Sequence, residues 1–427
     1  MKKFLVIWIG ELISSIGSGM TAFALSVYVY QSTGSVSLVS VISLAAFLPT
    51  ILLSPLGGVL ADRYDRRLLM IIGDLFSGLG LLYVLWNIHI GTSSMLPVII
   101  GVAFNAVFVA LLEPSFRATI TDLLRAEEYA KASGMIQIAG NARYLISPAL
   151  AGILLAVSDI RLILLLDICT FFITVVTVVL VRKSIGRSMP REKQGALAEI
   201  RQGFSALKAN KGVCALIVLM ACVCFFIGFL QTLVSPMVLA VSDAKTVGIL
   251  ESVCAVGMLL GSVWIGIVGI KQGYVRVLSI AGMGGSIFMA LAGVSTSLII
   301  TGAGIFLFFL FLPFMNTSAD VLVRSNVPNE VQGRVWGIIS LLSQAGTAVA
   351  YVLSGVLADH IFEPLLAEQG LLAGSIGRLI GVGQGRGIGF MLVLSGLGMI
   401  PAAFTIGRSK SIQKLENSVK KEEPPCT

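Results

Sequence analysis

Long apolar runs follow one another along most of the chain, separated by short polar segments. A helix needs about 20 residues to cross a hydrocarbon core about 30 Å thick, so each run predicts a membrane-spanning helix. Six runs precede a polar stretch at 182–212 and six follow it. We expect spanning helices at 4–30, 38–60, 68–88, 95–117, 132–157, 161–181, 213–240, 246–270, 276–294, 297–321, 335–358 and 387–407.

The polar stretch separates two equal sets of spans. The pattern predicts an all-α membrane protein with twelve transmembrane helices in two six-helix bundles, at 1–181 and 213–407. A cytoplasmic connector is expected at 182–212 and a cytoplasmic tail at 408–427. We expect a short interfacial helix in the last external loop, 359–385, and a plain loop is the alternative.

Basic residues fix the orientation of these helices. With both termini in the cytoplasm, 25 of the 30 Lys and Arg residues fall on the inner side, four fall on the outer side, and Arg143 lies within a helix. Membrane proteins carry this excess of basic residues in their cytoplasmic loops. The net charge of +8 is therefore a signal of topology, and no nucleic-acid partner is expected. The first apolar run, which follows Lys2 and Lys3, is long enough to span, so we expect it to stay as the first helix rather than to be cleaved.

The composition agrees with a membrane protein. Hydrophobic residues make up 56% of the chain and charged residues 12%. A soluble domain carries about 25% charged residues, so this chain lacks the side chains to cover a surface that faces water. The six cysteines and two histidines show no disulfide or metal-ligand spacing, and we expect neither a metal site nor a cofactor.

The two halves of the chain resemble each other. At a constant offset of 203, Glu127 corresponds to Glu330 and Gly152 to Gly355. Membrane halves repeated in this way are typical of transporters in which the halves rock around a site between them.

A charged motif, Gly58-Val-Leu-Ala-Asp62-Arg63-Tyr-Asp65-Arg66-Arg67, joins the second and third predicted helices. Gly58 permits close helix approach, and Asp62 can pair with an arginine or with a helix N-terminus. Such a pair holds one conformation and breaks in another, which predicts a conformational latch. Simple anchoring of Arg66 and Arg67 at the inner membrane surface is the alternative, but it leaves Asp62 unexplained. The predicted latch consists of Gly58, Asp62, Arg63, Arg66 and Arg67.

This motif resembles the Gly-x-x-x-Asp-Arg/Lys-x-Gly-Arg/Lys-Arg/Lys signature of the major facilitator superfamily, and it departs at Asp65, where the family has glycine. The fifth predicted helix also resembles the Gly-x8-Gly-x3-Gly-Pro-x2-Gly-Gly pattern of drug:proton antiporters. The positions that fit are Gly134, Pro148 and Gly152; those that depart are Arg143, Ser147 and Ala151. The loop at 327–335 and the stretch Gly385–Gly389 look most like the macrolide-efflux branch. The resemblance implies a multi-pass exporter in a bacterial plasma membrane.

Ionisable groups within spans are costly, at about 2.5–3.5 kcal/mol each on insertion scales, so each is a functional candidate. Glu11 is the first of them, because it forms a polar stripe at helical spacing with Ser14, Ser15, Ser18 and Thr21. We expect the stripe to face a watery cavity; the alternative is a glutamate that stays hydrated near the inner interface.

Four more intramembrane charges are candidates for proton coupling. Glu251 is the second choice for a proton carrier, and Asp74 and Asp167 are further acidic candidates. Removing a carboxyl group from water disfavours its charged form, as a proton carrier requires. Arg143 needs a carboxylate partner, and the sequence does not rank Glu11, Asp74 and Asp167 for this role. A structural ion pair and a coupling role for Arg143 are both open.

Two i,i+4 pairs, Glu113 with Arg117 and Asp320 with Arg324, are expected to be structural. Polar and aromatic residues at other positions are candidates for lining a substrate cavity. They are Ser15, Ser18, Phe23, Gln137, Asn141, Tyr144 and Asn316.

The function predicted is export of amphipathic small molecules, such as macrolide-like drugs, by proton-coupled alternating access. The chain contains no phosphate-binding loop of the Gly-x4-Gly-Lys-Ser/Thr type, so an ion gradient is the expected driver. The expected partners are a small-molecule substrate, protons and the lipid bilayer, with the protein as a monomer. One alternative is a carrier for a siderophore or metabolite, including a uniporter; a remote alternative is a membrane-embedded lipid enzyme.

Overall fold

A computed structural model describes residues 1–91, 94–124, 128–182, 207, 210–270 and 272–417. Within these ranges twelve helices are long and apolar enough to cross a membrane, and the described chain contains no strand, as the sequence predicts. Most of the predicted connector, 183–206, and the end of the tail, 418–427, lie outside the described residues. The spans are α1 (Lys2–Thr33), α2 (Val36–Arg63), α3 (Arg66–His89), α4 (Leu96–Leu123), α5 with α6 (Tyr129–Leu145 and Ser147–Val157), α7 (Ile160–Arg182), α9 (Lys211–Leu239), α10 (Ala244–Val268), α11 (Tyr274–Val294), α12 (Leu298–Arg324), α13 (Asn329–Leu357) and α16 (Arg386–Arg408).

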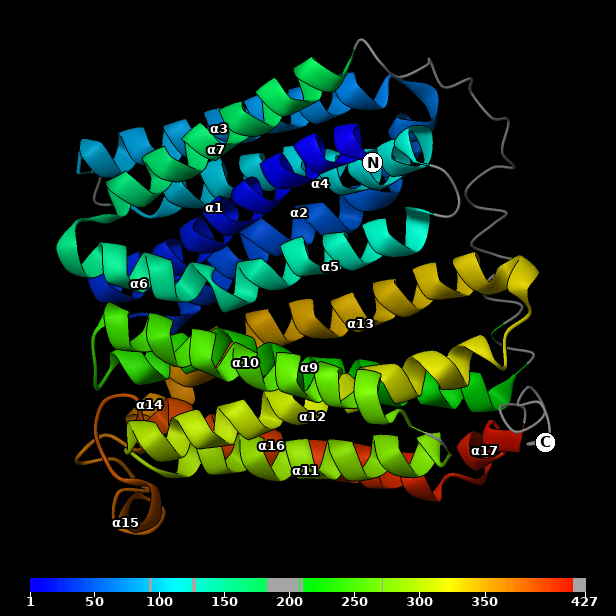
Figure 1. Cartoon of the computed structure of the whole chain (residues 1–427). Coiled ribbons are helices and arrows are strands. Elements are labelled where there is room, and N and C mark those ends of the chain that lie inside the picture. The colour runs from blue at the N-terminus through cyan, green and yellow to red at the C-terminus, as the bar shows by residue number, and fades with distance from the viewer. Residues whose placement is uncertain (92–93, 125–127, 183–206, 208–209, 271, 418–427) are drawn as a thin grey trace. The chain divides into compact units, whose positions relative to one another are not determined.

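The chain forms two compact units. The first consists of Met1–Glu192 and Ser242–Ser252, and the second of Lys193–Val241 and Val253–Thr427. In the first unit α1 packs against α7, α5 and α6, and α4 packs against α2 and α3 (Figure 1). In the second unit α11 packs against α12 and α16, and α9 packs against α13 and α16.

The fifth span is broken in the middle. Ile146 separates α5 from α6. Its ψ of −40° is still in the right-handed helical range, so the chain keeps its helical sense from α5 into α6. Pro148 has no backbone N–H, so the carbonyl of Tyr144 loses the hydrogen bond that an unbroken helix would give it. The single helix predicted at 132–157 is therefore two helical segments joined at Ile146.

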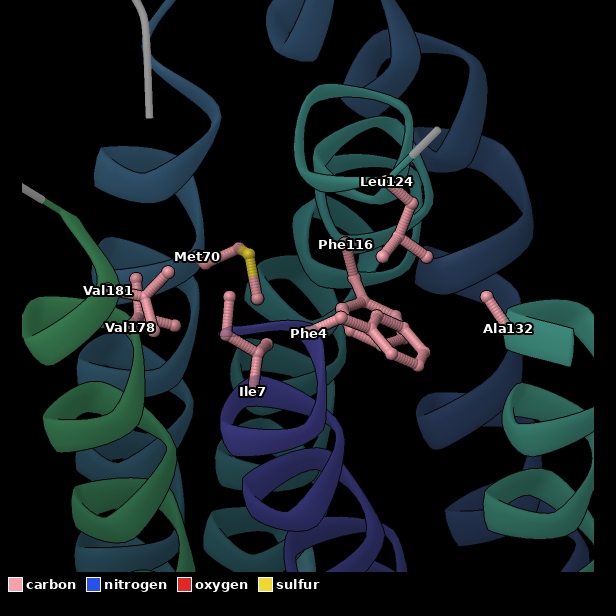
Figure 2. Close-up of a cluster of buried hydrophobic side chains, with 8 residues drawn as sticks. All are labelled: Phe4, Ile7, Met70, Phe116, Leu124, Ala132, Val178 and Val181. Carbon is pink, nitrogen blue, oxygen red and sulfur yellow. The ribbon is translucent and has the colours of Figure 1, made fainter. Parts of the chain in front are cut away.

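An apolar cluster closes one end of the first unit (Figure 2). It brings together the start of α1, the start of α3, the end of α4 and the end of α7. Phe4 and Ile7 are 0% and 2% exposed, and Met70 is 1% exposed. Apolar side chains fill this end of the first unit. They therefore separate the charged groups deeper in the unit from the solvent at this end. The cluster consists of Phe4, Ile7, Met70, Phe116, Leu124, Ala132, Val178 and Val181.

One helix contact recurs in both units. A Cβ atom at Gly57 of α2 would meet the carbonyl oxygen of Ala110 and the ring of Pro114 on α4. A Cβ atom at Gly261 of α10 would likewise meet the carbonyl oxygen of Leu310 and the ring of Pro313 on α12. Glycine opposite a proline-bearing helix thus allows the same close approach twice, in keeping with the internal repeat in the sequence.

The long loop before α16 contains a π-helical turn at Ala358–Phe362 and two short helical turns, α14 (Glu363–Leu365) and α15 (Gly377–Ile380). Glu363 holds this loop to α16. Its Oε2 atom accepts a hydrogen bond of 3.1 Å from the N–H of Gly385, and its Oε1 atom accepts one of 3.0 Å from the N–H of Ile388. The carboxylate therefore caps a helix N-terminus, where backbone N–H groups lack partners within the helix.

Candidate functional site

Three carboxylates lie inside the first unit, on three different helices. Asp74 on α3 and Asp167 on α7 are each 1% exposed, and Glu11 on α1 is partly buried. Asp74 interacts electrostatically with both Glu11 and Asp167, and Glu11 interacts with Glu113 on α4. Acidic groups of like charge thus follow one another from α4 through α1 and α3 to α7. We call Glu113, Glu11, Asp74 and Asp167 the carboxylate series.

Asp167 is held by hydroxyl groups from two helices. Ser18 on α1 donates a hydrogen bond of 3.3 Å to its Oδ1 atom. The hydroxyl of Thr170 on α7 donates to the carbonyl of Asp167 at 2.7 Å and also lies 3.3 Å from the same Oδ1 atom. A Cβ atom at Gly17 would lie 2.7 Å from that oxygen, so only glycine lets α1 approach so closely. Thr170 is not among the residues predicted from the sequence, although an Asp-x-x-Thr spacing puts both side chains on one helix face.

Asp74 has a different environment. Its Oδ2 atom is buried and has no hydrogen-bond partner among the described residues. A buried polar atom without a partner carries an energetic penalty, which is larger for a charged group. At 1.5 Å per residue, Asp74 lies about 12 Å along α3 from Arg66, within the apolar part of the span.

Arg143 is on α5, at the place where α5 packs against α1. It interacts electrostatically with Asp167, which identifies one of the three carboxylates that the sequence left unranked. Its aliphatic stem passes α1 at Gly19, where an added Cβ atom would lie 2.9 Å from Arg143 Cγ. Close by, Ser147 donates a hydrogen bond of 2.9 Å to the carbonyl of Ile16. The kinked fifth span and α1 are therefore joined directly beside Asp167.

The predicted cavity residues are spread over several helices. On α5, Gln137 and Tyr144 are exposed and Asn141 is partly exposed, and their spacing places all three on one accessible face, whereas Arg143 lies on the other side of the helix. Lipid is a poor solvent for such a face, since it carries the amides of Gln137 and Asn141.

The remaining site candidates are on other helices. Ser15 is partly exposed on α1, whereas Phe23 is packed inside the first unit at 6% exposure. Asn316 is exposed on α12 of the second unit, and Glu251 is partly buried on α10.

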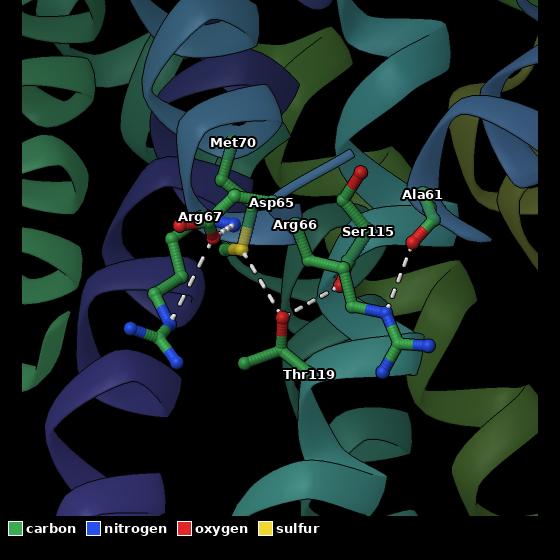
Figure 3. Close-up of polar contacts among 7 residues, drawn as sticks. All are labelled: Ala61, Asp65, Arg66, Arg67, Met70, Ser115 and Thr119. Carbon is green, nitrogen blue, oxygen red and sulfur yellow. Dashed lines mark hydrogen bonds and ion pairs between the residues drawn. The ribbon is translucent and has the colours of Figure 1, made fainter. Parts of the chain in front are cut away.

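In the loop motif, Asp65 is the N-cap of α3 (Figure 3). Its carboxylate accepts a hydrogen bond of 3.1 Å from the N–H of Arg67 and lies 4.0 Å from Arg67 Nε. Arg66 turns the other way, and its Nε donates to the carbonyl of Ala61 at 3.0 Å. The departure from the family signature at Asp65 thus has a local role in starting a helix. The side chains of the other latch residues, Gly58, Asp62 and Arg63, lie outside the described residues.

The predicted pair of Asp320 and Arg324 is confirmed. Arg324 Nε lies 2.6 Å from Asp320 Oδ2, and the guanidinium lies 5.6 Å from the ring centre of Trp336. The side chain of Arg117, the predicted partner of Glu113, lies outside the described residues. In the part of the chain that the structure describes, no group of His, Cys, Asp and Glu side chains has the arrangement of a metal site.

Comparison with known families decides the class of protein. The family model of the Major Facilitator Superfamily matches residues 7–351. The chain belongs to the major facilitator superfamily. Macrolide efflux protein A of Streptococcus pyogenes is 29% identical over 377 residues, covering 84% of this chain and 90% of the relative. Enterobactin exporter EntS of Escherichia coli O1:K1 / APEC is 22% identical over 367 residues, covering 83% and 85%.

Solved structures agree with the major facilitator fold. A bacterial homologue of the iron transporter ferroportin, in an inward-facing state, superposes with a TM-score of 0.72 at 14% identity, over 97% of this chain and 98% of that one. A D-xylose-proton symporter superposes with a TM-score of 0.67 at 16% identity, over 93% and 96%. The family consists of transporters, which removes the lipid-enzyme alternative, and its bacterial efflux relatives agree with a multi-pass protein of the cell membrane.

Proposed function

We propose that this major facilitator protein exports amphipathic small molecules, macrolide-like compounds among them, in exchange for protons. The observation that carries the proposal is the carboxylate series inside the first unit, with Arg143 beside its last member. A transporter that needed only an apolar path for its substrate would gain nothing from the three costly acidic groups Glu11, Asp74 and Asp167 within its spans.

The chemistry of the series suits proton coupling. Burial disfavours the charged form of a carboxyl group, so a proton or another cation must accompany each buried carboxylate. When Asp167 binds a proton, it loses its attraction for Arg143, and the contact between α1, α5 and α7 changes its electrostatic energy. Moving one charge through 100 mV is worth about 2.3 kcal/mol, which biases a carrier with two conformations of similar energy.

The accessible face of α5 is the proposed contact for substrate. Gln137 and Asn141 supply hydrogen-bond donors and acceptors, and Tyr144, which is 61% exposed, supplies an aromatic surface. Ser15 and Ser18 extend this polar character along α1, and Asn316 adds a polar group on the second unit. Similarity to macrolide efflux protein A supports an amphipathic cargo.

Three further features belong to the proposal. Both termini lie in the cytoplasm, as the basic residues indicate. The loop motif with Arg66 and Arg67 acts as a latch between conformations. The protein works as a monomer, with Glu251 as a second candidate for proton binding.

Flux into proteoliposomes tests the proposal. Purified protein is reconstituted, and uptake of radiolabelled erythromycin is measured with and without an imposed pH gradient, in parallel with a panel of other drugs. We expect uptake against a concentration gradient, faster than into protein-free liposomes that trap the basic drug passively, only when the lumen is acidic. Uptake that equilibrates the compound whatever the pH gradient identifies a uniporter and contradicts proton exchange.

Similarity to Enterobactin exporter EntS favours a second candidate cargo, a catecholate siderophore. Adding radiolabelled enterobactin to the same panel separates the two candidates. A siderophore flux driven by the pH gradient, without a macrolide flux, retains proton exchange and replaces the cargo.

A further inference from the structure

A groove runs between α3 and α7 on the surface of the first unit. It has a volume of about 290 Å³, and the side chains around its mouth are apolar. Leu79 of α3 and Phe172 of α7 are 51% and 55% exposed at this mouth. Apart from Asp74 at its bottom, the groove is lined by aliphatic and aromatic side chains and by Gly78, and an exposed apolar surface of this kind suits lipid, so the groove opens toward the hydrocarbon of the bilayer.

A single acidic residue, Asp74, lies among the residues that line the groove. Its side chain is 1% exposed, and its Oδ2 atom is the oxygen without a hydrogen-bond partner described above. The charged groups that act on it, Glu11 and Asp167, are both acidic. A cation at the bottom of the groove would satisfy the oxygen and offset the repulsion within the carboxylate series.

We propose that this groove binds a compact lipophilic ammonium ion that enters from the lipid phase, with Asp74 as its counter-ion. A protonated amine donates a charge-assisted hydrogen bond to the free carboxylate oxygen. Its apolar body lies along Leu79 and against the rings of Phe171 and Phe172, and an aromatic ring also attracts a cation. The volume is at the lower limit of sites for drug-sized molecules, which favours a compact amine over a macrocycle.

This site is separate from the accessible face of α5, and its occupancy does not rest on the proposed export. Binding is an equilibrium property that is measured without any gradient. Failure of the flux assay and failure of this binding assay are therefore distinguishable. An amine held at Asp74 adds a positive charge to the carboxylate series, so such compounds are also expected to alter its protonation.

Binding of two tricyclic compounds tests the proposal. Tritiated imipramine carries a tertiary amine, and carbamazepine is an uncharged compound with a related ring system. Saturable binding of each is measured by scintillation proximity to protein in phosphatidylcholine nanodiscs. The variants are Asp74→Asn, which keeps the shape of the side chain, and Leu79→Trp, which fills the groove. The matched control is Leu165→Trp, since Leu165 is 46% exposed on α7 and does not line the groove.

We expect saturable imipramine binding to the wild type and to Leu165→Trp, and none of carbamazepine. Affinity for imipramine should fall about tenfold or more in Asp74→Asn and in Leu79→Trp, a change of about 1.4 kcal/mol or more. Unchanged imipramine binding in Leu79→Trp would overturn the location. Equal binding of the two tricyclics would mean that any apolar body, such as a lipid chain, fills the groove, and it would overturn charge recognition. If Asp74→Asn does not fold, the Leu79→Trp variant still tests the location of the site, and the comparison of the two compounds still tests charge recognition.

Discussion

The hydroxyl group of Ser18 donates a hydrogen bond of 3.3 Å to Asp167, and this contact joins α1 to α7 at a carboxylate that is 1% exposed. Thr170 reaches the same oxygen atom, and Gly17 leaves room for it. The position of Asp167 is thus fixed from two helices at once. A carboxyl group that changes its charge during transport needs hydrogen-bond donors close by, because these donors stabilise its charged form.

The close approach at Gly17 gives the first prediction. The variant Gly17→Ala places a Cβ atom 2.7 Å from Asp167 Oδ1 and 2.8 Å from Thr170 Oγ1, so α1 and α7 must move apart. We expect the free energy of unfolding to fall by about 1–3 kcal/mol, as for other overpacked sites. Thermal unfolding in detergent measures the change. Gly140→Ala is the control, because an added Cβ atom there meets nothing within 4 Å, and its stability should not fall.

The accessible face of α5 gives the second prediction. In a cysteine-free background, Gly140→Cys and Gln137→Cys should react with a membrane-impermeant maleimide, because this face borders water in the proposed function. Ile153→Cys is the comparison, since Ile153 is 44% exposed on an apolar part of α6. We expect its labelling to be slower by at least about tenfold, because the reactive thiolate forms poorly in lipid. Equal labelling of all three positions would remove the argument for a watery path along α5.

The N-cap of α3 gives the third prediction. Asp65→Ala removes the acceptor for the N–H of Arg67 and should lower stability by about 1 kcal/mol. Asp65→Asn keeps an acceptor and should be close to the wild type. Asp65→Gly, which restores the residue of the family signature, should cost only a few tenths of a kcal/mol. Unfolding midpoints of the three variants check this order, and a loss with Asn as large as that with Ala would show that capping is not the role of Asp65.

Glu363 gives the fourth prediction. Glu363→Ala leaves the N–H groups of Gly385 and Ile388 without their acceptor, which should lower stability by about 1–3 kcal/mol. Glu363→Gln keeps one side-chain oxygen and should lose less. Glu368→Ala, at an exposed position in the same loop, should change stability by less than about 0.5 kcal/mol. Hydrogen exchange of the backbone N–H groups at the start of α16 measures the loss of capping directly. Unchanged protection of these groups from exchange in Glu363→Ala would contradict the capping role.

The length and apolar character of the spans allowed their number to be predicted from the sequence, because crossing a bilayer imposes both. The break at Ile146 was not predicted, since apolar residues continue through it and the kink depends on one missing N–H at Pro148. The loop before α16 was expected to contain one short interfacial helix. Its real form, a π-helical turn and two short helical turns, depends on contacts between Glu363 and a helix 22 residues further along the chain.

The candidate site was only partly accessible from the sequence. Glu11, Asp74, Asp167 and Arg143 stood out because charges are rare in spans. Their order was not readable, because helical spacing gives the face of each helix but not the neighbour that it meets. Gly17 carried no signal of its own, because its importance follows only from the approach of α1 to α7. Thr170 could have been found from its spacing to Asp167 on the same helix.

The most direct test follows proton movement through Asp167. Proteoliposomes that enclose the pH dye pyranine are given a gradient of erythromycin, or of whichever drug shows the largest flux, with no ion gradient. In the wild type we expect the drug to move down its gradient while protons move in the opposite direction, both faster than in empty vesicles. In Asp167→Asn, and in the double variant Glu11→Gln, Asp167→Asn, the drug should still move but the dye should report no proton flux beyond that of empty vesicles. Proton flux of wild-type size in both variants would contradict coupling through the carboxylate series.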